Sequence, residues 1–173
     1  MKRSRVRPLE WLLIVVFALV IVAVLFPTFP DGGRKTAASS ACLSNVKRLA
    51  LGMAFYASDH DDRFPRRDFW MDAIVPAVRE LKLTARTEEP GLFRCPKIVA
   101  GGYGYAFDSR LDRVKPESIE FIAEATMLFD SVNPIRNASD PFVSLPAVPR
   151  HWHRNNVAYA DGHAKGIYAP VVK

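Results

Sequence analysis

Cysteine is scarce in this chain of 173 residues, which contains only two, Cys42 and Cys95. They do not form a C-x-x-C motif and no histidine lies near either of them in the sequence, so the pattern does not predict a zinc site. A serine nucleophile elbow, a glycine-rich phosphate loop and a matched pair of carboxylates are also missing. These absences remove the common sequence signatures of hydrolases and nucleotide-binding enzymes. We therefore predict no catalytic residue, no metal and no cofactor.

No glycine precedes Gly32, and no polar residue interrupts the apolar run Trp11–Phe26. As a helix this run would be about 24 Å long, and extending it to Leu9 and Phe29 brings it near the roughly 30 Å of a bilayer core. An amphipathic helix of a soluble domain would carry polar residues on one face. The run therefore predicts a transmembrane helix over residues 11–29.

Basic residues are concentrated before this run, where residues 1–10 contribute +3 of the formal net charge of +6. A basic segment ahead of an apolar run is expected to stay in the cytoplasm. We predict a cytoplasmic leader over residues 1–10 and an extracytoplasmic domain over residues 30–173 of a single-pass inner-membrane protein. This domain keeps a charge of only +3, so it gives no reason to expect a nucleic-acid partner.

Both cysteines fall in the part of the chain expected to lie outside the cytoplasm, where disulfides persist. A bond between Cys42 and Cys95 would close a loop of about 50 residues and contribute about 3–4 kcal/mol. We predict this disulfide.

Two segments of the domain have clear local patterns. Apolar residues recur in steps of three and four along residues 36–57, which is typical of one stripe of an amphipathic helix. Residues 156–168 predict a hairpin around Asp161-Gly162, a dipeptide that favours a two-residue turn with positive φ at both positions. We expect the helix to pack on a small sheet that includes this hairpin.

Three histidines and one aspartate lie close to one another near the C-terminal end of the sequence. A metal-dependent hydrolase that uses these four residues is therefore a further hypothesis. Imidazole and carboxylate groups suit zinc or iron, but the histidine before the first hairpin strand and the turn residues are expected at opposite ends of the hairpin. The four residues are His151, His153, Asp161 and His163.

The order of several motifs resembles the bacterial prepilin-like family, relatives of type IV pilins and type II secretion pseudopilins. The similarity runs through the segment 42–65, Phe93-Arg-Cys-Pro96 and the segment 156–163. His151, nine further residues and Asp161-Gly162 match the C-terminal H-x9-DG signature of that family. The resemblance covers most of the chain from Cys42 onward.

The resemblance implies an α+β, pilin-like fold in which a long N-terminal helix, transmembrane in its first half, packs on a small antiparallel sheet. It implies a non-catalytic role in assembly within a type II secretion or type IV pilus-like system. Its partners would be other pilin-like subunits or secretion-system proteins. Glu10 corresponds to the family glutamate that pairs with the N-terminal amine of a neighbouring subunit.

The chain departs from the family at the place where the prepilin peptidase cuts, because members carry a glycine there and the first glycine here is Gly32. This departure leaves a second hypothesis open, an anchored extracytoplasmic binding module that keeps the pilin fold and does not polymerise.

Overall fold

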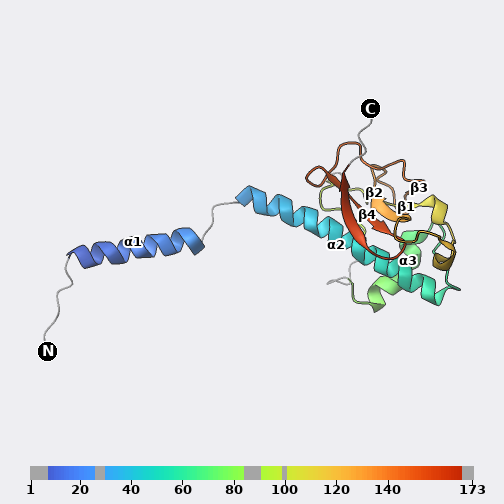
Figure 1. The fold of residues 1–173 in the computed structure, drawn as a ribbon, viewed down its shortest axis with the longest axis horizontal. Coiled ribbons are helices and arrows are strands. Elements are labelled where there is room, and N and C mark those ends of the chain that lie inside the picture. The colour runs from blue at the N-terminus through green and yellow to red at the C-terminus, as the bar shows by residue number, and fades with distance from the viewer. Residues whose placement is uncertain (1–7, 26–29, 84–90, 99–100, 169–173) are drawn as a thin grey trace. The chain divides into compact units, whose positions relative to one another are not determined.

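The computed structural model describes residues 8–25, 30–83, 91–98 and 101–168. The chain divides into two compact units, residues 1–35 and residues 36–173. Among the described residues, the regular structure comprises three α-helices and a five-stranded sheet (Figure 1).

Helix α1 spans Pro8–Leu25 and is apolar from Trp11 onward. Its 18 residues correspond to about 27 Å of helix, and the apolar part to about 22 Å, whereas the hydrocarbon core of a bilayer is about 30 Å thick. Within the ranges that the structure describes, no helix combines the length and the hydropathy needed to cross a membrane.

This finding overturns the transmembrane helix predicted over residues 11–29. The predicted single-pass inner-membrane location and its cytoplasmic N-terminus are overturned with it. The prediction counted apolar residues on both sides of the run to reach the thickness of a bilayer, whereas the described helix α1 is Pro8–Leu25. Residues 26–29, which the prediction counted, and residues 1–7 of the predicted leader lie outside the described residues.

The second helix, α2, spans Pro30–Asp59, and the third, α3, spans Trp70–Glu80. The stripe predicted for residues 36–57 lies on α2, where Cys42, Val46, Leu49 and Met53 are completely buried. Helices α2 and α3 approach closely at Gly52, where a Cβ atom would lie 2.9 Å from a methyl group of Val78. A side chain at this position would force the two helices apart.

The sheet has the order β3-β1-β2-β4-β5 and is mixed. The central pairs, β1–β2 and β2–β4, are antiparallel, as is β4–β5, whereas β1 and β3 are parallel. The strands are β1 (Tyr105–Asp108), β2 (Thr126–Asp130), β3 (Ser139–Asp140), β4 (Arg154–Tyr159) and β5 (Ala164–Tyr168).

The predicted fold, a long N-terminal transmembrane helix on an antiparallel sheet, is contradicted by the mixed sheet and by the finding that no described helix could cross a membrane. The segment 131–150 contains four prolines and returns to the sheet, where β3 pairs with the edge of β1 through Phe107 and Asp108. A parallel pair of two residues leaves no periodic pattern from which it could have been predicted.

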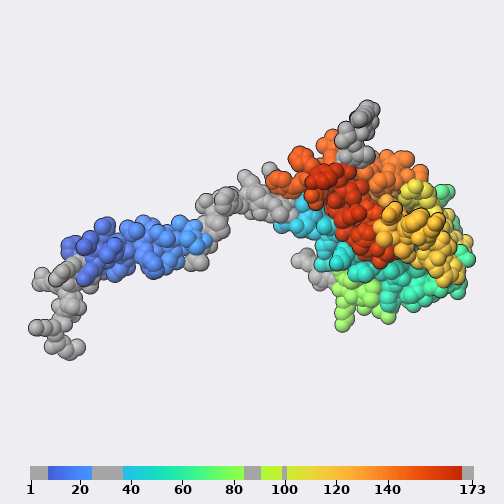
Figure 2. Space-filling view, in the orientation of Figure 1, coloured from blue at the N-terminus to red at the C-terminus, as the bar shows by residue number. Residues whose placement is uncertain are grey.

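The two faces of the sheet bury different side chains, as expected from the alternation along each strand. Tyr105, Phe107 and Leu128 belong to the main core together with residues of α2 and α3. Ala106, Phe129 and neighbouring residues form a second cluster, against which Phe142 and Leu145 of the segment 131–150 pack. In the space-filling view, these elements of residues 36–168 form one closely packed body (Figure 2).

The C-terminal hairpin pairs Arg154 with Tyr168 at one end and Ala158 with Ala164 at the other. Its connection covers residues 160–163, since β4 ends at Tyr159 and β5 begins at Ala164. Gly162 has a φ of +90°, while Asp161 is not among the residues with positive φ. The expected two-residue turn with two positive φ values is therefore wrong, and a longer turn with a single left-handed glycine replaces it.

Candidate functional site

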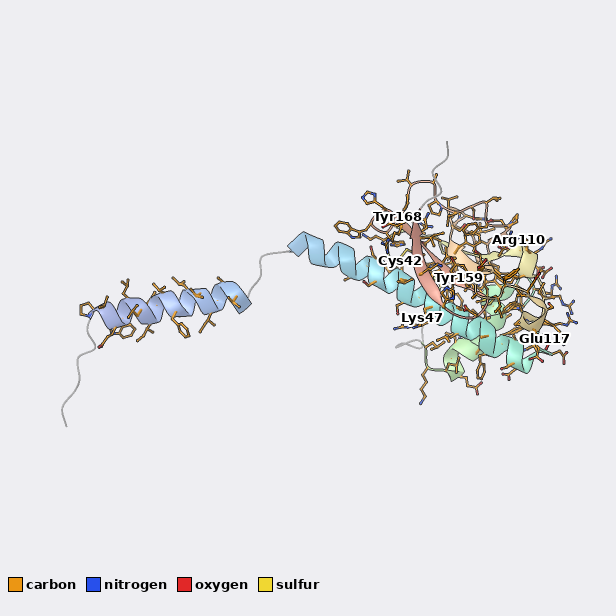
Figure 3. All side chains as sticks on the ribbon, in the orientation of Figure 1. Cys42, Lys47, Arg110, Glu117, Tyr159 and Tyr168 are labelled. Carbon is orange, nitrogen blue, oxygen red and sulfur yellow. A yellow bond between two sulfur atoms is a disulfide. The ribbon has the colours of Figure 1, made fainter. Side chains whose placement is uncertain are left out.

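A disulfide joins Cys42 of α2 to Cys95, with the two Cα atoms 5.2 Å apart (Figure 3). The predicted pairing is confirmed. Both cysteines are buried, with exposed fractions of 0% and 2%. The bond ties the segment around Cys95, which belongs to no helix or strand, to the middle of α2. Asn45 reinforces this connection one turn further along α2, because its amide group donates hydrogen bonds to the backbone carbonyl groups of Gly91 and Arg94.

His151 lies directly beside the disulfide. Its Nε2 atom is 3.5 Å from the Sγ atom of Cys95 and 3.3 Å from the Oδ2 atom of Asp130. The same carboxylate oxygen accepts a hydrogen bond of 2.6 Å from the backbone N–H of Asn156. Asp130 is completely buried and His151 is 5% exposed. The C-terminal residue of β2, the start of β4 and the disulfide thus meet at one buried polar cluster, which we call the Cys–His–Asp cluster (Cys42, Cys95, Asp130 and His151).

A tight turn brings His151 to this position. Trp152 and His153 both have positive φ values, and the backbone N–H and C=O groups of His151 and Arg154 bond to each other on either side of them. Two successive positive φ values are typical of a two-residue hairpin turn of the I′ kind. The turn faces His151 into the cluster and leaves His153 exposed.

The surroundings of the cluster are polar but closed to water. The buried hydroxyl group of Tyr105 donates a hydrogen bond to the carbonyl oxygen of Cys42. Burial, together with the negative charge of Asp130, raises the pKa of Tyr105. The Arg150 guanidinium donates hydrogen bonds to the carbonyl oxygens of Ser131, at 2.6 Å, and Gly104. Arg150 thereby fixes the chain on both sides of the cluster, next to Asp130 and next to His151.

Two atoms of the cluster lack hydrogen bonds. Within the described part of the chain, neither Asp130 Oδ1 nor His151 Nδ1 has a partner, although both atoms are buried. Buried polar groups are nearly always paired, because leaving one unpaired costs about 1–3 kcal/mol. A ligand bound at the cluster could therefore supply partners for these two buried atoms.

The structure does not assemble the metal site hypothesised from the sequence. In the described ranges, Cys42, Cys95 and His151 are the one group of three or more possible metal-ligating side chains whose ligand atoms lie close together. His163 instead bonds to Asp161, with an Nδ1–Oδ1 distance of 2.6 Å, and its ring stacks on that of Tyr159. The hydrolase hypothesis loses its geometric basis, because His151 is buried in the cluster, His153 is exposed in the turn before β4, and Asp161 and His163 lie at the hairpin turn.

The H-x9-DG residues likewise have separate local surroundings. His151 belongs to the buried cluster, whereas the carboxylate of Asp161 accepts the backbone N–H of His163 and holds the turn at Gly162. Glu10, the residue expected to take part in assembly, lies in the first turn of α1 and is exposed.

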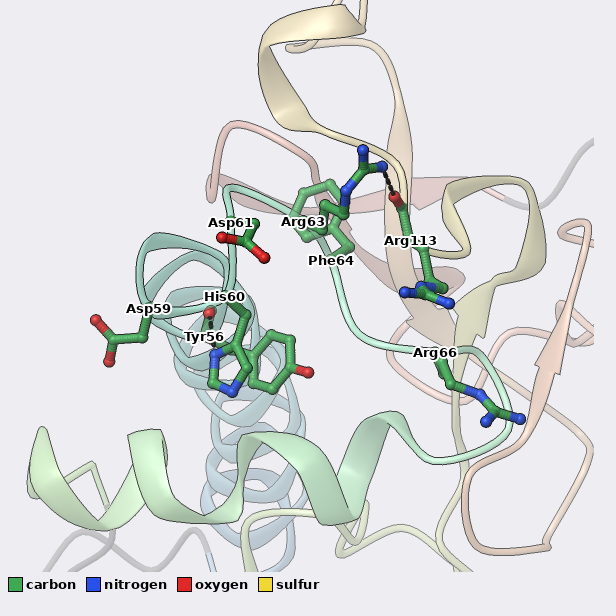
Figure 4. Close-up of a pocket in the computed structure, with 8 residues that line it drawn as sticks. All are labelled: Tyr56, Asp59, His60, Asp61, Arg63, Phe64, Arg66 and Arg113. Atoms are coloured by element: carbon green, nitrogen blue, oxygen red, sulfur yellow. Dashed lines mark hydrogen bonds between the residues drawn. The ribbon is translucent and has the colours of Figure 1, made fainter.

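A surface pocket of about 380 Å³ lies where α2 ends (Figure 4). The ring of His60 stacks on Tyr56 at a centroid distance of 3.8 Å. Arg63 donates a hydrogen bond to the backbone carbonyl of Arg113. The lining mixes acidic and basic groups, so its charge selects neither cations nor anions. Its residues are Tyr56, Asp59, His60, Asp61, Arg63, Phe64, Arg66 and Arg113.

The sequence interpretation missed the contact of Asp130 with His151 and a second polar network around Asp72. A carboxylate that ends an apolar strand, as in Leu128-Phe129-Asp130, was the available signal for the first. The proximity of His151 to Cys95 had no sequence signal, because the two residues are 56 positions apart.

Comparison with known proteins adds no family assignment, since no family model, no curated protein and no solved structure matches the chain.

The network around Asp72 joins α3 to the segment before β3. Asp72 accepts hydrogen bonds from the Arg136 guanidinium, the shorter being 2.5 Å, and one of 2.6 Å from the amide of Asn137. The hydrogen bond from Arg136 is the largest influence on the carboxylate, and the pKa of Asp72 is lowered below its ordinary value of 3.8. Both side chains of the ion pair are about one-third exposed, at 33% and 30%, so solvent weakens the pair.

We expect Asp72→Asn to lower the free energy of unfolding at neutral pH by about 1 kcal/mol. Because the pKa is lower in the folded protein, the carboxylate stabilises the fold fully above its unfolded pKa of about 3.9. This contribution is lost as the pH falls through the folded pKa. Denaturant unfolding at several pH values should show the difference from the unmodified protein shrinking in acid. In the control Asp68→Asn the lost partner, Arg66, is well exposed, and the cost should stay below about 0.5 kcal/mol. A pH-independent cost for Asp72→Asn would contradict the assignment.

Proposed function

We propose that this protein is a non-catalytic structural subunit that acts by assembly, with α1 packing in a bundle with the α1 helices of other copies. The observation that carries the proposal is the exposed apolar surface of α1. Its large apolar side chains between Leu9 and Val24 are 40–72% exposed in the single chain. Figure 3 shows side chains projecting from opposite sides of this helix.

Such a surface requires a partner. Burial of one aliphatic side chain of this size contributes about 1.5–3 kcal/mol, and large exposed apolar patches mark interaction sites. A helix with one apolar stripe could bury that stripe against a single neighbouring helix. A helix that is apolar all round is buried on all sides, which favours several neighbouring helices over a single one.

The resemblance to prepilin-like proteins supports the same role. In that family, apolar N-terminal helices bundle, and the chain retains the H-x9-DG residues His151, Asp161 and Gly162. The natural setting of this proposal is a short filament or tip complex of a type II secretion or type IV pilus-like system. The binding-module hypothesis differs in one respect, since it predicts that the chain stays monomeric.

The test is the assembly state of the full chain, measured by analytical ultracentrifugation in buffer and with phosphatidylcholine vesicles. We expect large assemblies for the unmodified chain. Val16→Lys combined with Val20→Lys should give monomers, because buried lysines would lie unpaired in an apolar bundle. The matched control is Val143→Lys combined with Val148→Lys. These two valines are 76% and 84% exposed and belong to the other unit, so this variant should assemble like the unmodified chain.

Three results would contradict the proposal: a monomeric unmodified chain, assemblies that survive the Val16 and Val20 substitutions, or monomers that sediment only when bound to vesicles. The first favours the binding module, and the third assigns the α1 surface to lipid.

A further inference from the structure

We propose that the Cys–His–Asp cluster binds a zinc ion when its disulfide is reduced, with Cys42, Cys95, His151 and Asp130 as the four ligands. The Sγ atoms of both cysteines and a ring nitrogen of His151 lie within 4.8 Å of one another. Two thiolates, one imidazole and one carboxylate form a donor set that zinc accepts in proteins. This inference is independent of the proposed assembly through α1.

Two separations measured from His151 match edges of a tetrahedral zinc site. With Zn–S and Zn–N bonds of about 2.3 and 2.0–2.1 Å, neighbouring sulfur and nitrogen ligands should be about 3.6 Å apart, and nitrogen and oxygen ligands about 3.4 Å apart. The distance from Cys95 Sγ to His151 Nε2 is 3.5 Å, and that from His151 Nε2 to Asp130 Oδ2 is 3.3 Å. The histidine, the carboxylate and one sulfur thus already have the spacing of zinc ligands.

The buried carboxylate of Asp130 has few hydrogen-bond partners. Asp130 is completely buried, and its Oδ1 atom has no hydrogen-bond partner among the described residues. The other oxygen is held by the backbone N–H of Asn156, a contact of the kind that orients metal-ligating carboxylates. A buried carboxylate beside an imidazole is costly without a cation, and zinc would supply the compensating charge.

The scaffold around the cluster does not rest on the disulfide alone. Asn45 joins α2 to the carbonyl groups of Gly91 and Arg94, and Tyr105 bonds to the carbonyl group of Cys42. These contacts hold both cysteine segments in place after the S–S bond opens. The two sulfurs then need to separate to about 3.8 Å, the edge expected between two sulfur ligands of a tetrahedral zinc ion.

The redox step balances with a dithiol as reductant. The dithiol transfers two electrons to the Cys42–Cys95 bond and becomes a disulfide, while the two cysteines become thiols. Binding of Zn²⁺ then releases the two thiol protons, because thiolates are the ligands. Oxidation by a disulfide reverses the reaction and releases the ion. Zinc binding and the disulfide are therefore alternative states of the same two residues.

The test measures zinc and cobalt binding by the full chain, kept under a dithiol or fully oxidised. We expect one equivalent of Zn²⁺ in the reduced protein and none in the oxidised protein. Co²⁺ in the reduced protein should show thiolate-to-cobalt charge transfer and the intense visible bands of a tetrahedral site. Near-ultraviolet circular dichroism of the reduced protein should stay native-like when zinc is present.

His151→Ala should weaken binding more than about 100-fold, because even substitutions of groups that only orient metal ligands cost about 10–100-fold. His163→Ala is the matched control, since His163 is bound at the exposed hairpin turn, and its affinity should be unchanged. The proposal is overturned if the reduced chain binds no zinc. It is also overturned if His151→Ala binds as tightly as the unmodified chain, which would indicate chelation by two cysteines of an opened chain.

Discussion

Replacing both cysteines by alanine, Cys42→Ala with Cys95→Ala, should lower the free energy of unfolding by about 4 kcal/mol. The bond links residues 53 positions apart, so its loss frees a long loop in the unfolded chain. In the chain-entropy model, a loop of this length corresponds to about 4 kcal/mol. Domains of this size are stable by only about 5–15 kcal/mol, so the change is a large share of the total.

Urea unfolding monitored by fluorescence gives the measurement. Cys42→Ala alone breaks the same bond and is the control, because it should cost nearly as much as the double substitution if the bond itself carries the effect. A loss below about 1 kcal/mol in the double variant would show that the packing around α2 holds the loop without the bond. A much larger loss in the single variant would point to the unpaired Cys95 thiol.

Trp70→Ala should also cost about 4 kcal/mol, because it removes the largest completely buried side chain of the core. The ring centroid of Trp70 lies 6.4 Å from that of Phe93 and 6.3 Å from that of Phe107, so it joins α3 to the segment before Cys95 and to β1. Its indole N–H donates a hydrogen bond of 3.0 Å to the carbonyl oxygen of Ala138, next to β3.

The conservative substitution separates packing from hydrogen bonding. Trp70→Phe keeps most of the aromatic volume and removes one of the two donors to the carbonyl of Ala138, which still accepts the N–H of Phe107, so it should cost about 0.5–1.5 kcal/mol. Trp152→Ala is the control because Trp152 is 62% exposed, and its cost should stay within about 0.5 kcal/mol. Equal losses for Trp70→Ala and Trp152→Ala, measured by the same denaturant unfolding, would contradict the assigned core.

Two predictions from the sequence agree with the structure, the buried stripe of α2 and the disulfide. The stripe of Cys42, Val46, Leu49 and Met53 lies on α2 and faces the core, because helical periodicity is a property of neighbouring residues and survives in any fold that buries one face. The disulfide could be predicted because the chain offers a single pair of cysteines.

The apolar run shows where a local pattern misleads. The run does form a helix, as predicted. The predicted transmembrane helix also counted the residues that flank the run, whereas the described helix α1 is Pro8–Leu25. The length of an apolar helix depends on where it ends, and helix ends are harder to predict than helix interiors.

Turn positions were also decided by their surroundings. The two successive positive φ values predicted at Asp161-Gly162 occur instead at Trp152-His153, which carry no glycine. The pairing of His151 with Arg154 and the burial of His151 stabilise that turn, and neither is encoded in the dipeptide itself.

By itself, the sequence determined the amphipathic face of α2, the C-terminal hairpin, the cysteine pair and the apolar character of the N-terminal segment. Only the tertiary structure decided that β3 joins β1 in parallel and that His151 meets Cys95 and Asp130. The reason is physical: periodicity and pairing by elimination depend on residue types along the chain. A contact between residues 56 positions apart depends on how the sheet and α2 pack, which no local pattern records.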